Sequence, residues 1–214
     1  IDEIWQAALE DSGGSLFNGS MLVLSDYEQN EAGVEVRAHF TGYKNFMAQM
    51  KRPDLSLGVK PVGVSGIVMI EEGETRHVVF ARRSSANSCY QGYLELVPSG
   101  TIDEKCCRPD GNVDFKGKLL EEFGEEVCTL PPGSFKEVSG FAFILDTDKN
   151  IYDVCCRIVV ENNRETIRRE LSKSEEYQSA EIVPVSELEA FASMHRERMV
   201  PTSLALLEVF AQCR

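Results

Sequence analysis

The chain has 214 residues, of which 43% are hydrophobic and 27% are charged. These proportions are typical of one compact globular unit with room for a small appended lobe, and they exclude a disordered, collagen-like or coiled-coil chain. The 35 acidic and 22 basic side chains give a formal net charge of −13. Because a chain with this negative charge repels nucleic-acid phosphates and anionic lipid, we expect neither a nucleic-acid nor a membrane partner.

The seven cysteines of the chain include two adjacent pairs, Cys106-Cys107 and Cys155-Cys156. Neither pair has the two-residue gap of a zinc site, and neither has a histidine close by. We therefore expect reduced thiols in a cytoplasmic protein. Cys155 and Cys156 lie in an apolar run, where free cysteines are usually buried as small hydrophobic side chains.

The first 61 residues predict an N-terminal lobe. Proline, glycine and charged residues interrupt the hydrophobic pattern over residues 52–61, which we take as the boundary. Val34, Val36, Ala38 and Phe40 alternate on one face of a strand that forms a hairpin with the strand before it. The expected elements are, in chain order, an amphipathic helix with Ile4, Trp5, Ala8 and Leu9 on its apolar face, strands over residues 19–25 and 34–40, and a helix over residues 43–50.

Residues 62–214 predict a second unit, in which strands and helices interleave around antiparallel pairs. The expected elements are, in chain order, strands over residues 62–70, 77–82 and 93–97, a helix over 113–128, strands over 137–145 and 152–161, a helix over 164–171, a strand over 181–185, a helix to Phe191 opened by a Ser186/Glu189 capping box, and a helix over 203–213. This order predicts the α+β class, with helices on the faces of a mixed sheet.

The helix at residues 119–128 carries the clearest chemical signal. At about 100° per residue, Glu122, Glu125 and Glu126 fall within one arc of roughly 100°, and the apolar side chains occupy the adjacent arc. Stacked carboxylates with little basic compensation suit Mg²⁺, which prefers oxygen ligands and bridges to phosphate oxygens. A solvated acidic face on an acidic protein is the alternative interpretation of the same pattern.

The context of this helix resembles the Nudix box. The segment Leu94-Glu-Leu-Val-Pro-Ser-Gly100 is followed by a loop and then by the acidic helix. The Nudix box has a glycine, a glutamate after five residues, and, after seven more, the pattern Arg-Glu-apolar-x-Glu-Glu-x-Gly-apolar. One frame places the final glutamate pair at Glu121-Glu122 and recovers Gly124, but it puts Lys118 where the first glutamate of this pattern belongs.

A second frame places the final pair at Glu125-Glu126, and we adopt it because it recovers Glu122 and keeps all three carboxylates on one face. Its loop is seven residues longer than the loop of the family, with Glu104 nearest to the first glutamate of the box. The helix also departs from the family pattern at three positions, which are Glu121 for arginine, Cys128 for the closing glycine and Thr129 for the last apolar residue.

The resemblance extends from residue 16 to residue 213 and includes the order of the strands. An N-terminal lobe precedes the altered box and contains the segments Leu16-Phe-Asn-Gly19 and Gly42-Tyr-Lys-Asn-Phe46. With this lobe, the chain resembles the Nudix subgroup that hydrolyses UDP-glucose. This resemblance implies an α/β/α sandwich around a mixed sheet, and hydrolysis of UDP-glucose to UMP and glucose 1-phosphate with Mg²⁺ or Mn²⁺. Whether the chain has a protein partner is unknown from the sequence.

The same resemblance implies the site residues. The Gly100 carbonyl, Glu122 and Glu126 are the expected metal ligands, and Glu125 is either a further ligand or the catalytic base. One of Arg82 and Arg83 is expected to bind the diphosphate, because adjacent strand residues point to opposite faces. The residues expected to contact uracil or sugar are Phe17, Asn18 and Tyr43, with core packing as the alternative for Phe17 and Tyr43.

Two other functions stay open from the sequence. The altered box does not exclude a Nudix enzyme that acts on another nucleoside diphosphate derivative, such as ADP-ribose. A catalytically silent module that binds a nucleotide is suggested by the missing arginine and glycine. The three retained carboxylates favour an enzyme, because a binding module has little reason to stack like charges on one helix face.

Overall fold

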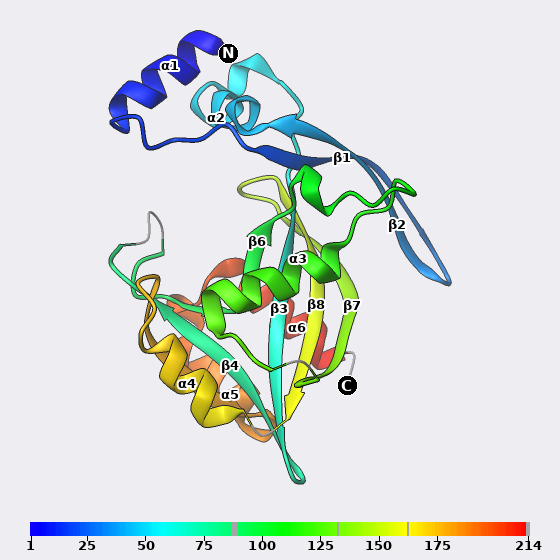
Figure 1. Ribbon diagram of the computed structural model, residues 1–214, viewed down its shortest axis with the longest axis vertical. Helices are drawn as coiled ribbons and strands as arrows, with labels where there is room; N and C mark the ends of the chain where they lie inside the picture. The colour runs from blue at the N-terminus through cyan, green and yellow to red at the C-terminus, as the bar shows by residue number, and fades with distance from the viewer. Residues whose placement is uncertain (87–89, 132, 162, 213–214) are drawn as a thin grey trace.

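The structure of the protein, a computed structural model, describes residues 1–86, 90–131, 133–161 and 163–212 (Figure 1). Seven strands form one mixed sheet, in which β3 (Val62–Glu72) and β8 (Ile151–Glu161) pair in parallel and the other pairings are antiparallel. The further strands of this sheet are β4 (Thr75–Arg83), β5 (Leu94–Leu96), β6 (Ser99–Thr101), β7 (Phe135–Asp146) and β9 (Tyr177–Pro184). This arrangement confirms the predicted α+β class.

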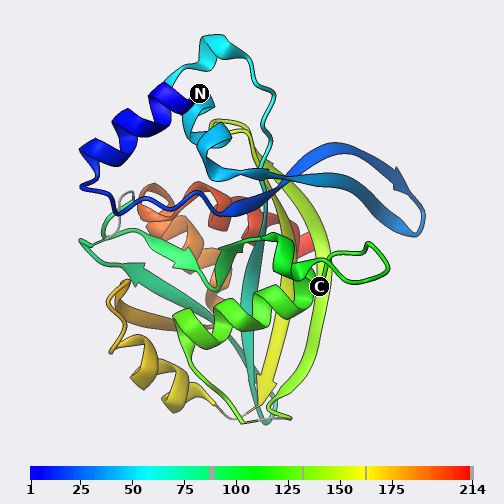
Figure 2. The same ribbon diagram turned by 45° about the horizontal axis from the view of Figure 1, so that its top comes forward.

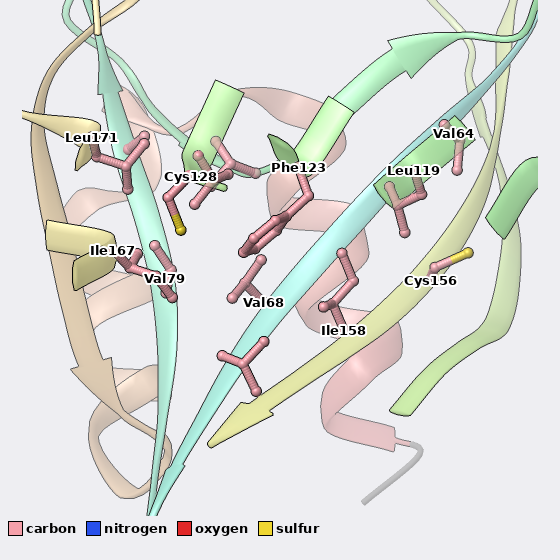
Figure 3. Packing of buried hydrophobic residues seen from close by; sticks show 14 of the residues in the cluster. Val64, Val68, Val79, Leu119, Phe123, Cys128, Cys156, Ile158, Ile167 and Leu171 are labelled. Atoms are coloured by element: carbon pink, nitrogen blue, oxygen red, sulfur yellow. The ribbon is translucent and has the colours of Figure 1, made fainter. Parts of the chain in front are cut away.

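Helices cover both faces of the sheet, as Figures 1 and 2 show. Alternate residues of β3 point to opposite faces, so Val64 and Val68 belong to one core cluster while Ile67 and Met69 belong to the other. The first cluster contains Leu119, Phe123, Ile167 and Leu171, which converge on the sheet in Figure 3. The helices are α3 (Phe115–Glu122) and α4 (Arg164–Leu171) on this face, and α5 (Leu188–His195) and α6 (Pro201–Gln212) on the other.

The N-terminal segment forms a separate two-stranded sheet with two helices. It is joined to the larger sheet through β1, where the Leu22 amide donates a hydrogen bond to the Ile102 carbonyl at 2.8 Å, and Leu22 lies in the first core cluster. The division at residue 61 stays a prediction. The elements of this segment are α1 (Asp2–Asp11), β1 (Ser20–Asn30), β2 (Gly33–Gly42) and α2 (Tyr43–Lys51), and the short 3-10 turns of the chain are Pro53–Leu55, Glu104–Cys106, Val185–Glu187 and Arg196–Arg198.

Two details of the fold differ from the sequence-based expectations, and a third is not tested. The short strand β6 was not expected, because three residues after a proline carry no measurable periodicity. The predicted capping box is wrong, since α5 begins after a 3-10 turn with Glu187 at its N-cap and no side-chain cap hydrogen bond. The predicted end of the last helix at Cys213 lies outside the described residues.

The buried cysteines behave as expected. Cys155 and Cys156 are both fully buried, and the described cysteines are free thiols.

Within the described part of the chain, no helix combines the length and the apolar character that a bilayer crossing requires.

Candidate functional site

The site is built where β6 meets the end of α3. Gly100 of β6 pairs with Val64 of β3, which fixes this short strand against the larger sheet. A Cβ atom at residue 100 would overlap the carboxylate of Glu122, so the glycine is what lets the helix bring that side chain against β6. The predicted proximity of Gly100 and Glu122 is therefore present.

The last turn of the acidic helix is a π-turn. It covers Phe123–Val127, and the Cys128 amide donates a hydrogen bond to the Phe123 carbonyl, five residues earlier, at 2.9 Å. The expectation of one regular helix to residue 128 is wrong here, because a π-turn does not rotate by the 100° per residue on which the projection relied. Glu125 is exposed, whereas Glu126 is half-buried and bonded to β6.

Glu126 has polar partners but no cation. The Ser99 amide donates to its Oε2 at 3.1 Å, and the hydroxyl of Tyr177 lies 3.3 Å from the same oxygen. The pKa of Glu126 is raised to about 8, chiefly by burial and also by the neighbouring carboxylates of Glu122 and Glu95. Among the described lysines and arginines, none forms an ion pair with this carboxylate.

Glu122 is compensated by a lysine on the preceding turn. Lys118 Nζ lies 2.7 Å from the Glu122 carboxylate and 3.0 Å from that of Glu121. Burial raises the pKa of Glu122 although the lysine lowers it. For Lys118, burial lowers the pKa, but its hydrogen bonds to the two glutamates raise it by more. The two glutamates against β6 therefore differ, because only Glu122 has a cation.

A second buried carboxylate, Glu95 of β5, completes the polar side of the site. It is 4% exposed, forms an ion pair with Arg83, and lies 3.4 Å from the Tyr177 hydroxyl. Burial raises the pKa of Glu95 despite the arginine. We did not predict Glu95 or Tyr177 as site residues. A charge between Leu94 and Leu96 was the available signal for Glu95, and Tyr177 carries no local signal.

A cavity of about 320 Å³ opens beside these residues. Of the predicted site residues, Gly100, Arg83 and Tyr43 line it, together with Ser99 and Glu95. The cavity extends to β1 and α2 of the N-terminal segment and to the turn between β7 and β8. Its lining there includes Met21, Phe46, Asp146, Lys149 and Asp153.

The other predicted substrate contacts lie elsewhere. Phe17 is 83% exposed, and Asn18 accepts a hydrogen bond from the Lys44 amide at 2.8 Å, so Asn18 stabilises the start of α2. Arg82 donates to the Gly92 carbonyl at 3.0 Å and faces Glu181 at 3.8 Å. Arg82 and Arg83 thus point apart, as strand alternation predicts, and Arg83 is the one that reaches the cavity.

The oxygen atoms at β6 fit a hard divalent cation. Among the described residues, no three histidine, cysteine, aspartate or glutamate side chains are close enough to form a metal-binding group by themselves. Mg²⁺, however, is usually held by one or two carboxylates and by phosphates of the substrate. Oxygen ligands of this kind are supplied by the carboxylates of Glu126 and Glu122 and by the Gly100 carbonyl. The exposed Glu125 stays a predicted ligand or base.

Comparison with known proteins identifies the fold. No protein-family model and no curated protein matches the sequence. A mutT/nudix family protein from Listeria innocua has a TM-score of 0.50 and 15% identity, over 71% of this chain and 92% of that chain. The NUDIX domain of Shewanella oneidensis NrtR complexed with ADP ribose has a TM-score of 0.48 and 14% identity, over 71% of this chain and 86% of that chain.

NrtR from Shewanella oneidensis complexed with a 27mer DNA has a TM-score of 0.47 and 16% identity, over 69% of this chain and 59% of that chain. The absence of a nucleic-acid partner stays a prediction from the net charge of this chain. The strand order, the helices on both faces and the match to the Listeria innocua protein show that this chain has the Nudix fold.

Proposed function

We propose that the protein hydrolyses the diphosphate of a UDP-sugar, converting UDP-glucose to UMP and glucose 1-phosphate. The observation that carries this proposal is Glu126, a half-buried carboxylate that has no cation among the described residues and accepts a hydrogen bond from the amide of Ser99, which lines the cavity. Burial favours the protonated form of such a carboxyl group, and a bound cation would favour the ionised form that can act as a ligand. The Nudix fold and the sequence resemblance to the UDP-glucose subgroup support this class of substrate.

A divalent cation would be held by Glu122, Glu126 and the Gly100 carbonyl. Bound there, Mg²⁺ or Mn²⁺ would neutralise diphosphate charge and lower the pKa of a bound water. This neutralisation matters for a chain with a net charge of −13, which otherwise repels an anionic substrate. The lysine at position 118 would then keep its bond to Glu121 when Glu122 turns to the ligand.

The protein's own side chains orient the reactants. Arg83 lines the cavity, and its guanidinium group suits the oxygens of a diphosphate. Tyr177 lies within hydrogen-bond distance of Glu95 and Glu126 and holds these carboxylates in place. The exposed Glu125 is the residue available to accept the proton of the attacking water, whose oxygen bonds to one phosphorus as the bridging P–O bond breaks.

A second candidate is hydrolysis of another nucleoside diphosphate derivative, such as ADP-ribose. The aromatic side chains of the cavity lining are Tyr43, Phe46 and Tyr90. Aromatic rings stack on a purine as readily as on a pyrimidine, because every base has a π-face. The lining is therefore compatible with adenine as well as uracil.

The test is phosphate release from a panel of UDP-sugars and ADP-ribose, with a coupling phosphatase, with and without Mg²⁺. We expect UDP-glucose turnover that requires Mg²⁺ and falls at least about 100-fold in Glu126→Gln, because the substitution removes a charged ligand. Glu121→Gln is the matched control on the exposed side of the same helix. It also separates the two frames, since only the first frame makes Glu121 a ligand.

Three outcomes would contradict the proposal. Full activity in Glu126→Gln would remove its central residue. Turnover of adenine substrates alone would favour the second candidate. Thermal stabilisation by nucleotide sugars without any product would indicate a silent binding module.

A further inference from the structure

The cavity has a second polar group, Asp153, which the proposed chemistry does not use. Asp153 lies on β8 and pairs with Gly63 of β3, next to the strand that carries Gly100. A Cβ atom at residue 63 would lie 2.7 Å from Asp153 Oδ1 and 3.0 Å from the Gly100 carbonyl oxygen. Glycine at this position therefore lets the two oxygens approach the same space, beside the proposed diphosphate site.

The Asp153 carboxylate has little compensation. Burial and the Asp146 carboxylate together raise its pKa to about 6, and the nearby Ser65 hydroxyl, which lowers the pKa, offsets only part of this rise. The nearby cation in the cavity lining, Lys149, lies over the Tyr90 ring at 4.5 Å from its centroid. An ionised carboxylate has about four lone-pair sites, so one serine hydroxyl leaves most of them available to a ligand.

We propose that Asp153 and Ser65 form a subsite that binds the hydroxyl groups of a neutral hexose attached to the diphosphate. This inference rests on the proposed function, and it names the part of the substrate that the cavity selects. A carboxylate accepts hydrogen bonds from two neighbouring hydroxyl groups, and Ser65 offers one more donor and acceptor. The location beside Gly100 places these groups next to the phosphate that carries the sugar.

Charge excludes the other ligands of similar size. Asp146 and Asp153 both line the cavity and repel a phosphate or a sugar acid at this end. Tyr43 and Phe46 of the N-terminal segment line the cavity as well and provide apolar surface. A carboxylate with adjacent apolar surface is suited to a ring that combines hydroxyl groups with C–H faces.

The test compares three substrates in wild type and Asp153→Ala. UDP-glucose has the hydroxyl groups of the hexose and those of the ribose. The methyl ester of uridine diphosphate lacks the hexose. The third substrate, 2′,3′-dideoxyuridine diphosphate glucose, keeps the hexose but lacks the ribose hydroxyl groups. We expect kcat/KM to fall about 10- to 100-fold for the two glucose-bearing substrates, the usual effect of losing hydrogen bonds to a charged group. The methyl ester should be unaffected.

Asp148→Ala is the matched control, because Asp148 is exposed on the turn between β7 and β8 and does not line the cavity. It should leave all three substrates unchanged. Asp153→Asn keeps the shape of the side chain and replaces the alanine variant if that variant does not fold. It should lower kcat/KM for the same two glucose-bearing substrates, by a smaller factor. An equal loss for all three substrates, or a loss confined to the two ribose-bearing substrates, would overturn the proposal.

A binding measurement separates this inference from the proposed function. In the presence of Mg²⁺, glucose 1-phosphate should raise the melting temperature of the wild type more than methyl phosphate does, and Asp153→Ala should abolish the difference. If this difference is present but UDP-glucose is not hydrolysed, the proposed activity fails and the subsite stands. If UDP-glucose is hydrolysed and the difference is absent, the subsite is wrong.

Discussion

Two carboxylates that line the cavity, Glu95 and Asp153, differ in how their negative charge is balanced. Glu95 is buried against the Arg83 guanidinium and lies near the Tyr177 hydroxyl. Asp153 has the Ser65 hydroxyl and a second carboxylate, Asp146, as its neighbours. A carboxylate with a cation contributes to the fold, whereas one with a single hydroxyl keeps its capacity to bind a ligand and is held at a cost in stability.

The largest expected effect breaks the paired side of this comparison. Arg83→Met leaves Glu95 buried without its cation, and removing one partner of a buried ion pair destabilises a protein by about 3–5 kcal/mol. Urea unfolding at pH 7.5 measures this loss. The double variant with Glu95→Leu should recover most of the stability, because it removes the unpaired charge as well. A loss below about 1 kcal/mol in Arg83→Met would show that the pair is not needed by the fold.

The unpaired side should respond in the opposite direction. The pKa of Asp153 is raised from 3.8 to about 6, so the folded state binds more protons than the unfolded state between these values, and ionised Asp153 destabilises the protein above pH 6. Asp153→Asn should therefore raise the free energy of unfolding by about 3 kcal/mol at pH 7.5. This gain in the free energy of unfolding should shrink as the pH falls from about 6 to about 4. It should disappear below about pH 4, where the carboxyl group is protonated in both the folded and the unfolded state.

Urea unfolding of wild type, Asp153→Asn and Asp148→Asn from pH 4 to pH 8 tests this prediction. The exposed Asp148 should show no such pH-dependent gain. Equal stability of wild type and Asp153→Asn at pH 7.5 would mean that the carboxylate is compensated after all. The remaining charged groups that line this end of the cavity, Asp146 and Lys149, are unchanged in these variants.

The smallest expected effect concerns the hydroxyl that connects Glu95 to Glu126. Tyr177 lies 3.4 Å from one carboxylate and 3.3 Å from the other, which are long hydrogen bonds. Tyr177→Phe should therefore cost about 1 kcal/mol in the free energy of unfolding, measured in urea. Tyr27→Phe, at a half-exposed ring of the hairpin, is the control. A loss as large as that of Arg83→Met would instead make Tyr177 a main support of the site.

Strands and helices were largely predictable from the sequence, because each depends on nearby residues. In β3, Val62, Val64, Val68 and Ile70 face one core cluster, and all four belong to the apolar run that predicted a strand over residues 62–70. The predicted helix over residues 164–171 agrees with α4 at both ends. The π-turn was not predictable, because its residues continue the same apolar pattern that a regular helix would show.

The candidate site was predictable only in part. Gly100, Glu122 and Arg83 were expected, because a proline-glycine bend, an acidic helix face and a strand end are visible locally. Glu95 and Tyr177 are 82 positions apart, and Tyr177 and Glu126 are 51 apart. No sequence period connects such residues, so their contact follows from the sheet.

The sequence by itself thus determined the elements, the apolar faces that form the core, and the acidic helix near a glycine bend. The tertiary structure decided which carboxylates have a cation. Glu122 has Lys118 four residues before it, whereas Glu126 and Asp153 depend on groups from other strands. Hydrophobic periodicity is a property of one segment, but the burial and pairing of a charge depend on every segment packed around it.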